Sequence, residues 1–148
     1  MSSSGEKGGR DACGILANLW RLIQSVMDDS EPALEALGLS AKAFFLLDSV
    51  GDHPFPAQLA RRMHLPPPTV TYLVKQLEAR GFLERRPEAG DLRKFRLIQT
   101  PAGKEALRQG GAALGEVFDE RLLRLSRDEV NSFDRIVGLL ARPRDGGA

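Results

Sequence analysis

The sequence feature that most constrains the fold is a pair of helical segments with a very short connection between them. The segment "FPAQLARRMH" and the segment at residues 68–80 each carry apolar side chains at helical spacing, and about four residues separate them. On the first segment these side chains are Leu59, Ala60 and Met63, and on the second they are Val70, Leu73, Val74 and Leu77. Two short helices joined this tightly form a helix-turn-helix.

Three prolines, Pro66 to Pro68, precede the second helix. A proline disfavours the helical conformation in the residue before it, so Pro66 and Pro67 are expected to be extended. The first amides of a helix have no intrahelical acceptor, and a proline there removes no hydrogen bond. We therefore expect Pro67 to be the N-cap, Pro68 the first helical residue, and Gly81 the residue that stops the helix.

The polar side of the second helix has the composition of a surface that reads DNA. It offers hydroxyl, phenol, amide and ammonium groups and no acid before Glu78. The residues on this side are Thr69, Thr71, Tyr72, Lys75 and Gln76. An ordinary solvated helix face has a similar composition, so the neighbouring segments must decide between the two interpretations.

The residues that follow this helix read as strand, turn and strand. In "FLERRPEAGDLRKFRLIQT", Phe95 and Leu97 alternate with Lys94 and Arg96, and the central "PEAGD" has the residues of a loop. Residues 40–100 are therefore predicted to form a winged helix-turn-helix. The predicted fold class is mainly α with a small β-hairpin wing.

The order of these segments resembles the MarR family of bacterial transcriptional regulators. The resemblance is close from Ser40 to about Leu107. It rests on the D-x-R motif of Asp91 and Arg93, on the T-x-x-G motif of residues 100–103, and on "LEARGFLERR". It implies a regulator rather than an enzyme, and a symmetric dimer that binds double-stranded DNA with one recognition helix per subunit in successive major grooves.

The resemblance also implies roles for the hairpin residues. Arg93 would enter the minor groove, where a narrow width concentrates negative potential. Asp91 would hold the wing turn and the arginine by hydrogen bonds, and Lys94 and Arg96 would add positive charge to the DNA contact. The alternative is an exposed hairpin with ordinary solvated charge.

Three positions depart from the family pattern. Tyr72 stands where an arginine is common, Pro66 and Pro68 replace hydroxyl residues, and Gln99 stands where leucine is usual. These departures leave the fold unchanged and alter the groups available for base reading. Tyr72 either donates to a phosphate oxygen or packs against its partner helix.

Charge is distributed unevenly along the chain, although the net charge is only +1. Residues 56–100 hold nine Lys or Arg and four acids, whereas residues 11–55 hold two Lys or Arg and seven acids. A basic face with an acidic back is typical of a protein that displaces counterions from phosphates. We expect a salt-sensitive DNA affinity.

The flanking segments, residues 11–39 and 101–142, are predicted to be dimerisation helices because their apolar stripes exceed what one small domain covers. The N-terminal stripe is Ile15, Leu16, Leu19, Trp20, Ile23, Val26 and Met27, and the C-terminal ones are Leu114, Val117, Phe118, Leu122, Leu125, Val130, Phe133, Val137 and Leu140. Ser126 begins a capping box. A separate short helix is expected from Asp29 or Ser30 to Gly38. A helical cap on a monomer is the alternative.

Other functions find less support in the sequence. The chain has no metal-ligand spacing, glycine-rich phosphate loop or nucleophile elbow, so neither a cofactor nor a metal is expected. No apolar run approaches the ~20 residues of a membrane span, and we expect a cytoplasmic protein. The ends, residues 1–10 and 143–148, are expected to be disordered.

The predicted function is that of a repressor that binds a palindromic operator and is relieved by a small aromatic or amphipathic effector. Residues proposed to line the effector pocket are Trp20, Met27, Phe44, Phe45, His53 and Phe55. A winged-helix protein-interaction module without DNA binding is one alternative. Oxidant sensing through Cys13, the one cysteine, is another.

Overall fold

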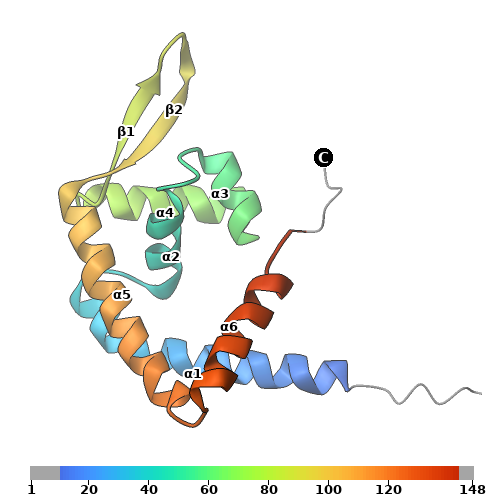
Figure 1. Cartoon of the computed structure of the whole chain (residues 1–148). Helices are drawn as coiled ribbons and strands as arrows, with labels where there is room; N and C mark the ends of the chain where they lie inside the picture. Colours follow the sequence, from blue (N-terminus) through green and yellow to red (C-terminus); the bar gives the residue numbers. More distant parts are fainter. Residues whose placement is uncertain (1–10, 144–148) are drawn as a thin grey trace, which may run out of the picture.

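The chain folds into six helices and one β-hairpin over residues 11–143, the part that the computed structural model describes (Figure 1). The elements are α1 Ala12–Ala36, α2 Ala41–Ser49, α3 Pro56–Met63, α4 Pro67–Ala79, β1 Leu83–Glu88, β2 Asp91–Gln99, α5 Pro101–Leu122 and α6 Arg127–Leu140. The predicted fold class is confirmed. Apart from residue 143, the two tails predicted to be disordered lie outside the described residues. No helix in the described part is long and apolar enough to cross a membrane.

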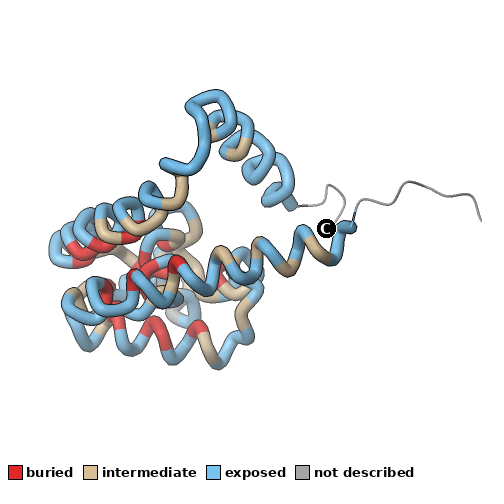
Figure 2. The backbone as a smooth tube through the Cα atoms, turned by 90° about the horizontal axis from the view of Figure 1, so that it is seen from below, coloured by how far each residue is buried: buried red, intermediate tan, exposed pale blue. Residues whose placement is uncertain are grey.

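The hydrophobic core lies among α2, α3 and α4, and α1 and α5 cover it (Figure 2). Leu46, Leu47 and Leu59 are fully buried at its centre. Leu97 brings the second strand of the hairpin into the same core. In contrast, α6 has no buried residue. The core therefore belongs to the helix-turn-helix, and α6 and the first half of α1 extend beyond it.

The first helix is one continuous helix, so the prediction of a separate short helix after Asp29 or Ser30 is wrong. Ser30 is fully buried and donates its hydroxyl proton to the carbonyl of Val26 at 2.6 Å, instead of capping a new helix. Val26, Ser30 and Leu34 are the buried residues of α1 and recur every four positions. Burial of this stripe against the core holds the helix together through Pro32.

The start of α4 also differs from the prediction. Pro66 is the N-cap, and both Pro67 and Pro68 are helical. The carbonyl of Pro66 accepts hydrogen bonds from the amides of Thr69 and Val70 at 3.0 and 3.2 Å. Because no first-turn amide of a helix needs an intrahelical acceptor, two successive prolines fit there, and this outweighs the steric bias against Pro67.

Glycines stop α1 and α4 as predicted. Gly38 and Gly81 have φ angles of +77° and +76°, which disfavour residues with a Cβ. After α4, the amide of Phe82 donates to the carbonyl of Leu77 at 2.9 Å and closes the last turn. The sharp stop aims the chain directly into β1.

The hairpin has a shorter turn than the predicted "PEAGD" loop. Glu88 pairs with Asp91, so the turn consists of residues 89 and 90, with Gly90 at φ +90°. At the base of the hairpin, the amide of Leu97 donates to the carbonyl of Pro54 at 2.8 Å. This bond fixes β2 against the loop between α2 and α3.

Candidate nucleic-acid interface

The predicted polar side of α4 faces away from the core. Thr71, Tyr72, Lys75 and Gln76 are exposed, and Thr69 is half-buried. The opposite side of the helix, which carries Val70, Leu73, Val74 and Leu77, is buried. We call the polar side of the helix, formed by Thr69, Thr71, Tyr72, Lys75 and Gln76, the α4 surface. They are free to meet a partner that approaches the helix from outside.

Two side-chain hydrogen bonds organise the α4 surface. The amide nitrogen of Gln76 donates to the hydroxyl oxygen of Tyr72 at 2.9 Å, and the hydroxyl of Thr71 donates to the carbonyl of Pro67 at 3.1 Å. Tyr72 is 61% exposed. The alternative that Tyr72 packs against its partner helix is therefore wrong, and its ring stands on the surface.

The hairpin projects beyond the helices (Figure 1), and Asp91 braces its tip. The carboxylate of Asp91 accepts a hydrogen bond from the backbone amide of Arg93 at 2.9 Å. Among the described residues, Asp91 bonds the backbone of Arg93 and makes no bond to its guanidinium. Arg93 and Lys94 are exposed, and neither forms an ion pair within residues 11–143.

The third predicted hairpin cation, Arg96, is already engaged. Its guanidinium nitrogen lies 3.4 Å from a carboxylate oxygen of Glu88, and the group lies 5.4 Å from the ring centre of Phe55. Arg96 is less available to a new partner than Arg93 or Lys94, because its contacts with Glu88 and Phe55 would have to break first.

Most of the acids in this region are neutralised by arginines of the hairpin. Three of the four acids between residues 56 and 100 form ion pairs. The pairs are Glu78 with Arg85 at 2.6 Å, Glu84 with Arg86 at 2.7 Å, and Glu88 with Arg96 at 3.4 Å. The cations outside these pairs therefore give the region its positive charge, and they include Lys75, Arg93 and Lys94.

The helix-turn-helix and the hairpin are similar to a known protein family. Residues 37–94 match the model of the MarR family. No curated protein sequence matches the chain. The helix-turn-helix and the first part of the hairpin are therefore similar to the MarR family.

Solved structures share the fold of this chain over nearly its whole length. Apo MarR from E. coli has 21% identity and a TM-score of 0.73, with 89% of this chain and 98% of that chain covered. A MarR-family transcriptional regulator from Rhodococcus sp. RHA1 has 20% identity and a TM-score of 0.78, with 90% and 96% covered. CouR from Rhodococcus jostii RHA1, solved with p-coumaroyl-CoA, has 22% identity and a TM-score of 0.75, with 93% and 96% covered. The family consists of transcriptional regulators and not of enzymes, as predicted.

Two exposed cations of α3 were not among the residues predicted to bind DNA. Arg61 and Arg62 are exposed in the last turn of α3, directly before the turn that leads into α4. Neither forms an ion pair within the described residues. In helix-turn-helix proteins the first helix crosses the DNA backbone, and these two arginines stand at the end of the corresponding helix here. The excess of positive charge in residues 56–100, to which both arginines contribute, was the sequence signal that could have indicated them.

Three of the six residues predicted to line an effector pocket lie in three different cavities of the described residues. Met27 lines a cavity of about 540 Å³ between α1 and α4, and Trp20 lines a groove between α1 and α6. Phe55 lines a hollow beside residues 93–95 of β2. Phe44 is buried in the core. In the single chain α1 carries Trp20 well beyond the core while α2 carries Phe44 into it, so an effector pocket shared by these residues stays a prediction.

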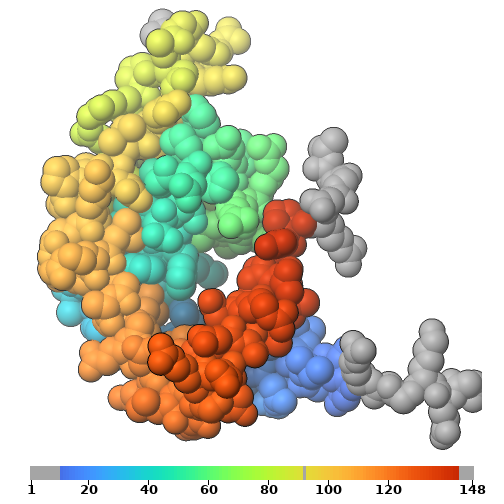
Figure 3. Space-filling view, viewed as in Figure 1, coloured from blue at the N-terminus to red at the C-terminus, as the bar shows by residue number. Residues whose placement is uncertain are grey.

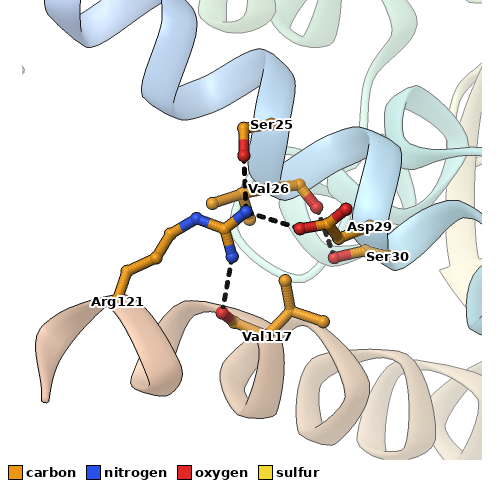
Figure 4. Close-up of polar contacts among 6 residues, drawn as sticks. All are labelled: Ser25, Val26, Asp29, Ser30, Val117 and Arg121. Carbon is orange, nitrogen blue, oxygen red and sulfur yellow. Dashed lines mark hydrogen bonds and ion pairs between the residues drawn. The ribbon is translucent and has the colours of Figure 1, made fainter.

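A second sizeable cavity, of about 630 Å³, lies where α1, α5 and α6 meet. Arg121 forms one wall and links two helices (Figure 4). Its guanidinium donates to the carboxylate of Asp29 at 2.6 Å, to the carbonyl of Val117 at 2.9 Å, and to the hydroxyl of Ser25. This network fixes α5 against α1, so the two long flanking helices have a defined angle to each other.

An apolar surface remains uncovered on the flanking helices. The groove between α1 and α6 is lined almost wholly by apolar side chains, and α6 stands apart from α2–α4 with a hollow between them (Figure 3). Exposed apolar residues on the two helices include Ile15, Leu16, Trp20, Ile23, Ile136, Val137, Leu139 and Leu140. Cys13 lies at the edge of this groove. Exposed apolar area of this kind marks an interaction site.

Proposed function

We propose that the chain is a cytoplasmic transcriptional repressor that binds a palindromic operator as a homodimer. The observation that carries the proposal is the distribution of paired and unpaired charge. Acids near α4 and the hairpin are held by arginines, whereas Lys75, Arg93 and Lys94 are exposed and unpaired within the described residues. Such a surface attracts phosphates without first breaking ion pairs.

In this proposal the α4 surface lies in the major groove and the hairpin tip in the adjacent minor groove. A minor groove selects arginine by its width and potential, and Asp91 holds the backbone at Arg93 in place for that contact. Thr69, Thr71, Tyr72, Lys75 and Gln76 meet base edges and phosphates. Arg96 contributes after release from Glu88.

The flanking helices supply the dimer. Residues 11–39 and 101–142 expose the α1–α6 apolar groove, and a second copy is the partner whose surface matches it by symmetry. A two-fold dimer places two α4 surfaces about one helical turn of DNA apart, so the operator is a palindrome.

The repressor is relieved by a small aromatic or amphipathic effector. CouR is solved with p-coumaroyl-CoA, and a MarR-family protein of Mycobacterium tuberculosis is solved with p-aminosalicylic acid. The cavity between α1 and α4 is the candidate site in this chain, because Gln76 and Arg80 of α4 form part of its lining. An effector there acts by favouring a dimer whose spacing no longer fits successive grooves.

A gel shift with the DNA upstream of the chain's own gene tests the proposal. Arg93→Ala should weaken the complex strongly. Arg108→Ala is the matched control, because it also removes one exposed guanidinium, on α5 and away from the hairpin. If both variants lost the same DNA affinity, the effect of Arg93→Ala would be due to net charge alone. Absence of any complex would favour a protein-interaction module instead.

A further inference from the structure

We infer that Gln76 reads an adenine in each operator half-site and that Tyr72 is the positioning residue that orients it. The inference rests on the proposed function, since it assigns the base that the α4 surface recognises. Both residues are exposed on the same side of α4, one helical turn apart.

The hydrogen bond between the two side chains sets the orientation of the Gln76 amide. Its nitrogen donates one N–H to the Tyr72 hydroxyl oxygen at 2.9 Å. The second side-chain N–H and the side-chain oxygen Oε1 of Gln76 have no hydrogen-bond partner among the described residues. One donor and one acceptor, fixed in order along one amide plane, are therefore available to a base.

Adenine is the base that matches this pair. Its major-groove edge presents the N7 acceptor beside the N6 amino donor, so a glutamine amide binds it through two hydrogen bonds. Guanine presents two acceptors, N7 and O6, and its O6 would face the carbonyl oxygen of Gln76. The amide therefore discriminates against guanine by repulsion as well as by a lost bond.

Tyr72 contributes by restricting the amide. A glutamine side chain without a partner samples many rotamers, and a half-turn of its amide exchanges donor and acceptor. The Tyr72 hydroxyl accepts from the nitrogen and so favours one orientation before DNA binds, which lowers the entropy cost of the base contact. Its own proton stays available for a phosphate oxygen.

The neighbouring hydroxyl does not compete for the amide. Thr71 donates to the carbonyl of Pro67 within α4. Its proton is thus used inside the helix. Within the described part of the chain, the bond between Gln76 and Tyr72 joins two outward side chains on this side of α4.

Selection from random duplexes, followed by fluorescence anisotropy on the enriched duplex, tests the inference. The wild-type consensus should contain an adenine in each half-site that becomes degenerate for Gln76→Ala. Replacing that adenine by 7-deazaadenine, which lacks the N7 acceptor, should weaken wild-type binding about 5- to 150-fold. It should leave the affinity of Gln76→Ala unchanged.

Tyr72→Phe keeps the ring and removes the hydroxyl. This variant should lower the ratio of the affinities for duplexes with adenine and with guanine at that position. If Tyr72 had only a structural role, this ratio would stay unchanged. Lys75→Ala is the control, because loss of a phosphate contact weakens all duplexes by one factor and leaves the ratio unchanged.

The outcomes separate this inference from the proposed function. If no duplex is enriched, the proposed function fails, and the inference fails with it. If a consensus is enriched and Gln76→Ala reproduces it, the adenine assignment alone is overturned. An unchanged base ratio in Tyr72→Phe overturns the positioning role.

Discussion

Gly103, at the start of α5, lies directly against the carbonyl of Phe82, and a Cβ atom at Gly103 would stand 2.2 Å from that oxygen. Thr100 completes the junction. Its hydroxyl donates to the carbonyl of Gly81 and accepts from the amide of Gly103 at 3.0 Å. The T-x-x-G motif therefore joins the end of α4 to the start of α5 and fixes the angle between the winged helix-turn-helix and α5.

Gly103→Ala should lower the free energy of unfolding by about 1–3 kcal/mol, because a backbone oxygen cannot move aside as a flexible side chain does. Gly115→Ala on the same helix is the control. It meets open space, and the better helix propensity of alanine should raise stability by roughly 0.5–1 kcal/mol. Urea denaturation at one fixed protein concentration measures both. Similar shifts for the two variants would contradict the close contact at Gly103.

The two partners of the α1–α5 ion pair should contribute unequally. The side chain of Asp29 is 61% exposed and that of Arg121 only 16% exposed. Asp29→Asn should cost at most about 1 kcal/mol, as for surface pairs. Arg121→Ala removes buried methylenes and the bond to Val117 as well, and should cost about 1–3 kcal/mol. Thermal unfolding of both variants checks the ranking, and a larger effect at Asp29 would refute it.

The apolar groove of α1 and α6 should hold the dimer. Trp20→Glu places a charge in the groove and should shift the protein from dimer to monomer in sedimentation velocity. Tyr72→Glu is the control, because Tyr72 is an aromatic residue of similar exposure, 61% against 65% for Trp20, on α4. It should leave the dimer intact. A wild-type protein that sediments as a monomer at micromolar concentration would rule out this interface.

Glu105 provides a pH-dependent test of the α5 surface. The guanidinium of Arg108 and, after it, the amide of Gln109 donate to its carboxylate and lower its pKa from 4.5 to about 2. Since the folded state favours the charged form, this stabilisation is present above about pH 4.5 and is lost as the pH falls toward 2. Arg108→Leu should raise the pKa of Glu105 in an NMR titration. A pKa that stays near 2 in this variant would remove Arg108 as the main cause.

The winged helix-turn-helix was predictable because its signals are local. Helical spacing at Leu59 and at Val70 to Leu77, strand alternation at Phe95 and Leu97, and the stop at Gly81 all lie within short windows. Each of these patterns follows from the geometry of one element. Tertiary contacts agree with them, so the prediction was confirmed.

Features that depend on how distant segments pack were not predictable in the same way. Ser30 was expected at the start of a separate helix, yet burial of Ser30 and Leu34 keeps α1 continuous there. Arg96 reads as a free cation, yet the hairpin pairing brings Glu88 to it. The residues predicted to line an effector pocket are mostly aromatic, but the path of α1 across the core separates Trp20 from Phe44 in the single chain. In each case the outcome depends on how residues outside one short window are packed, and a local sequence pattern contains no information about that packing.

The dependence of DNA affinity on salt tests the central claim most directly, because the claim is that unpaired cations on α4 and the hairpin bind phosphates and a minor groove. Fluorescence anisotropy should give an affinity for the selected duplex that falls steeply from low to moderate salt, and Arg93→Ala should reduce the slope of log K against log salt by about one. An affinity that is independent of salt, or a slope unchanged by Arg93→Ala, would contradict it.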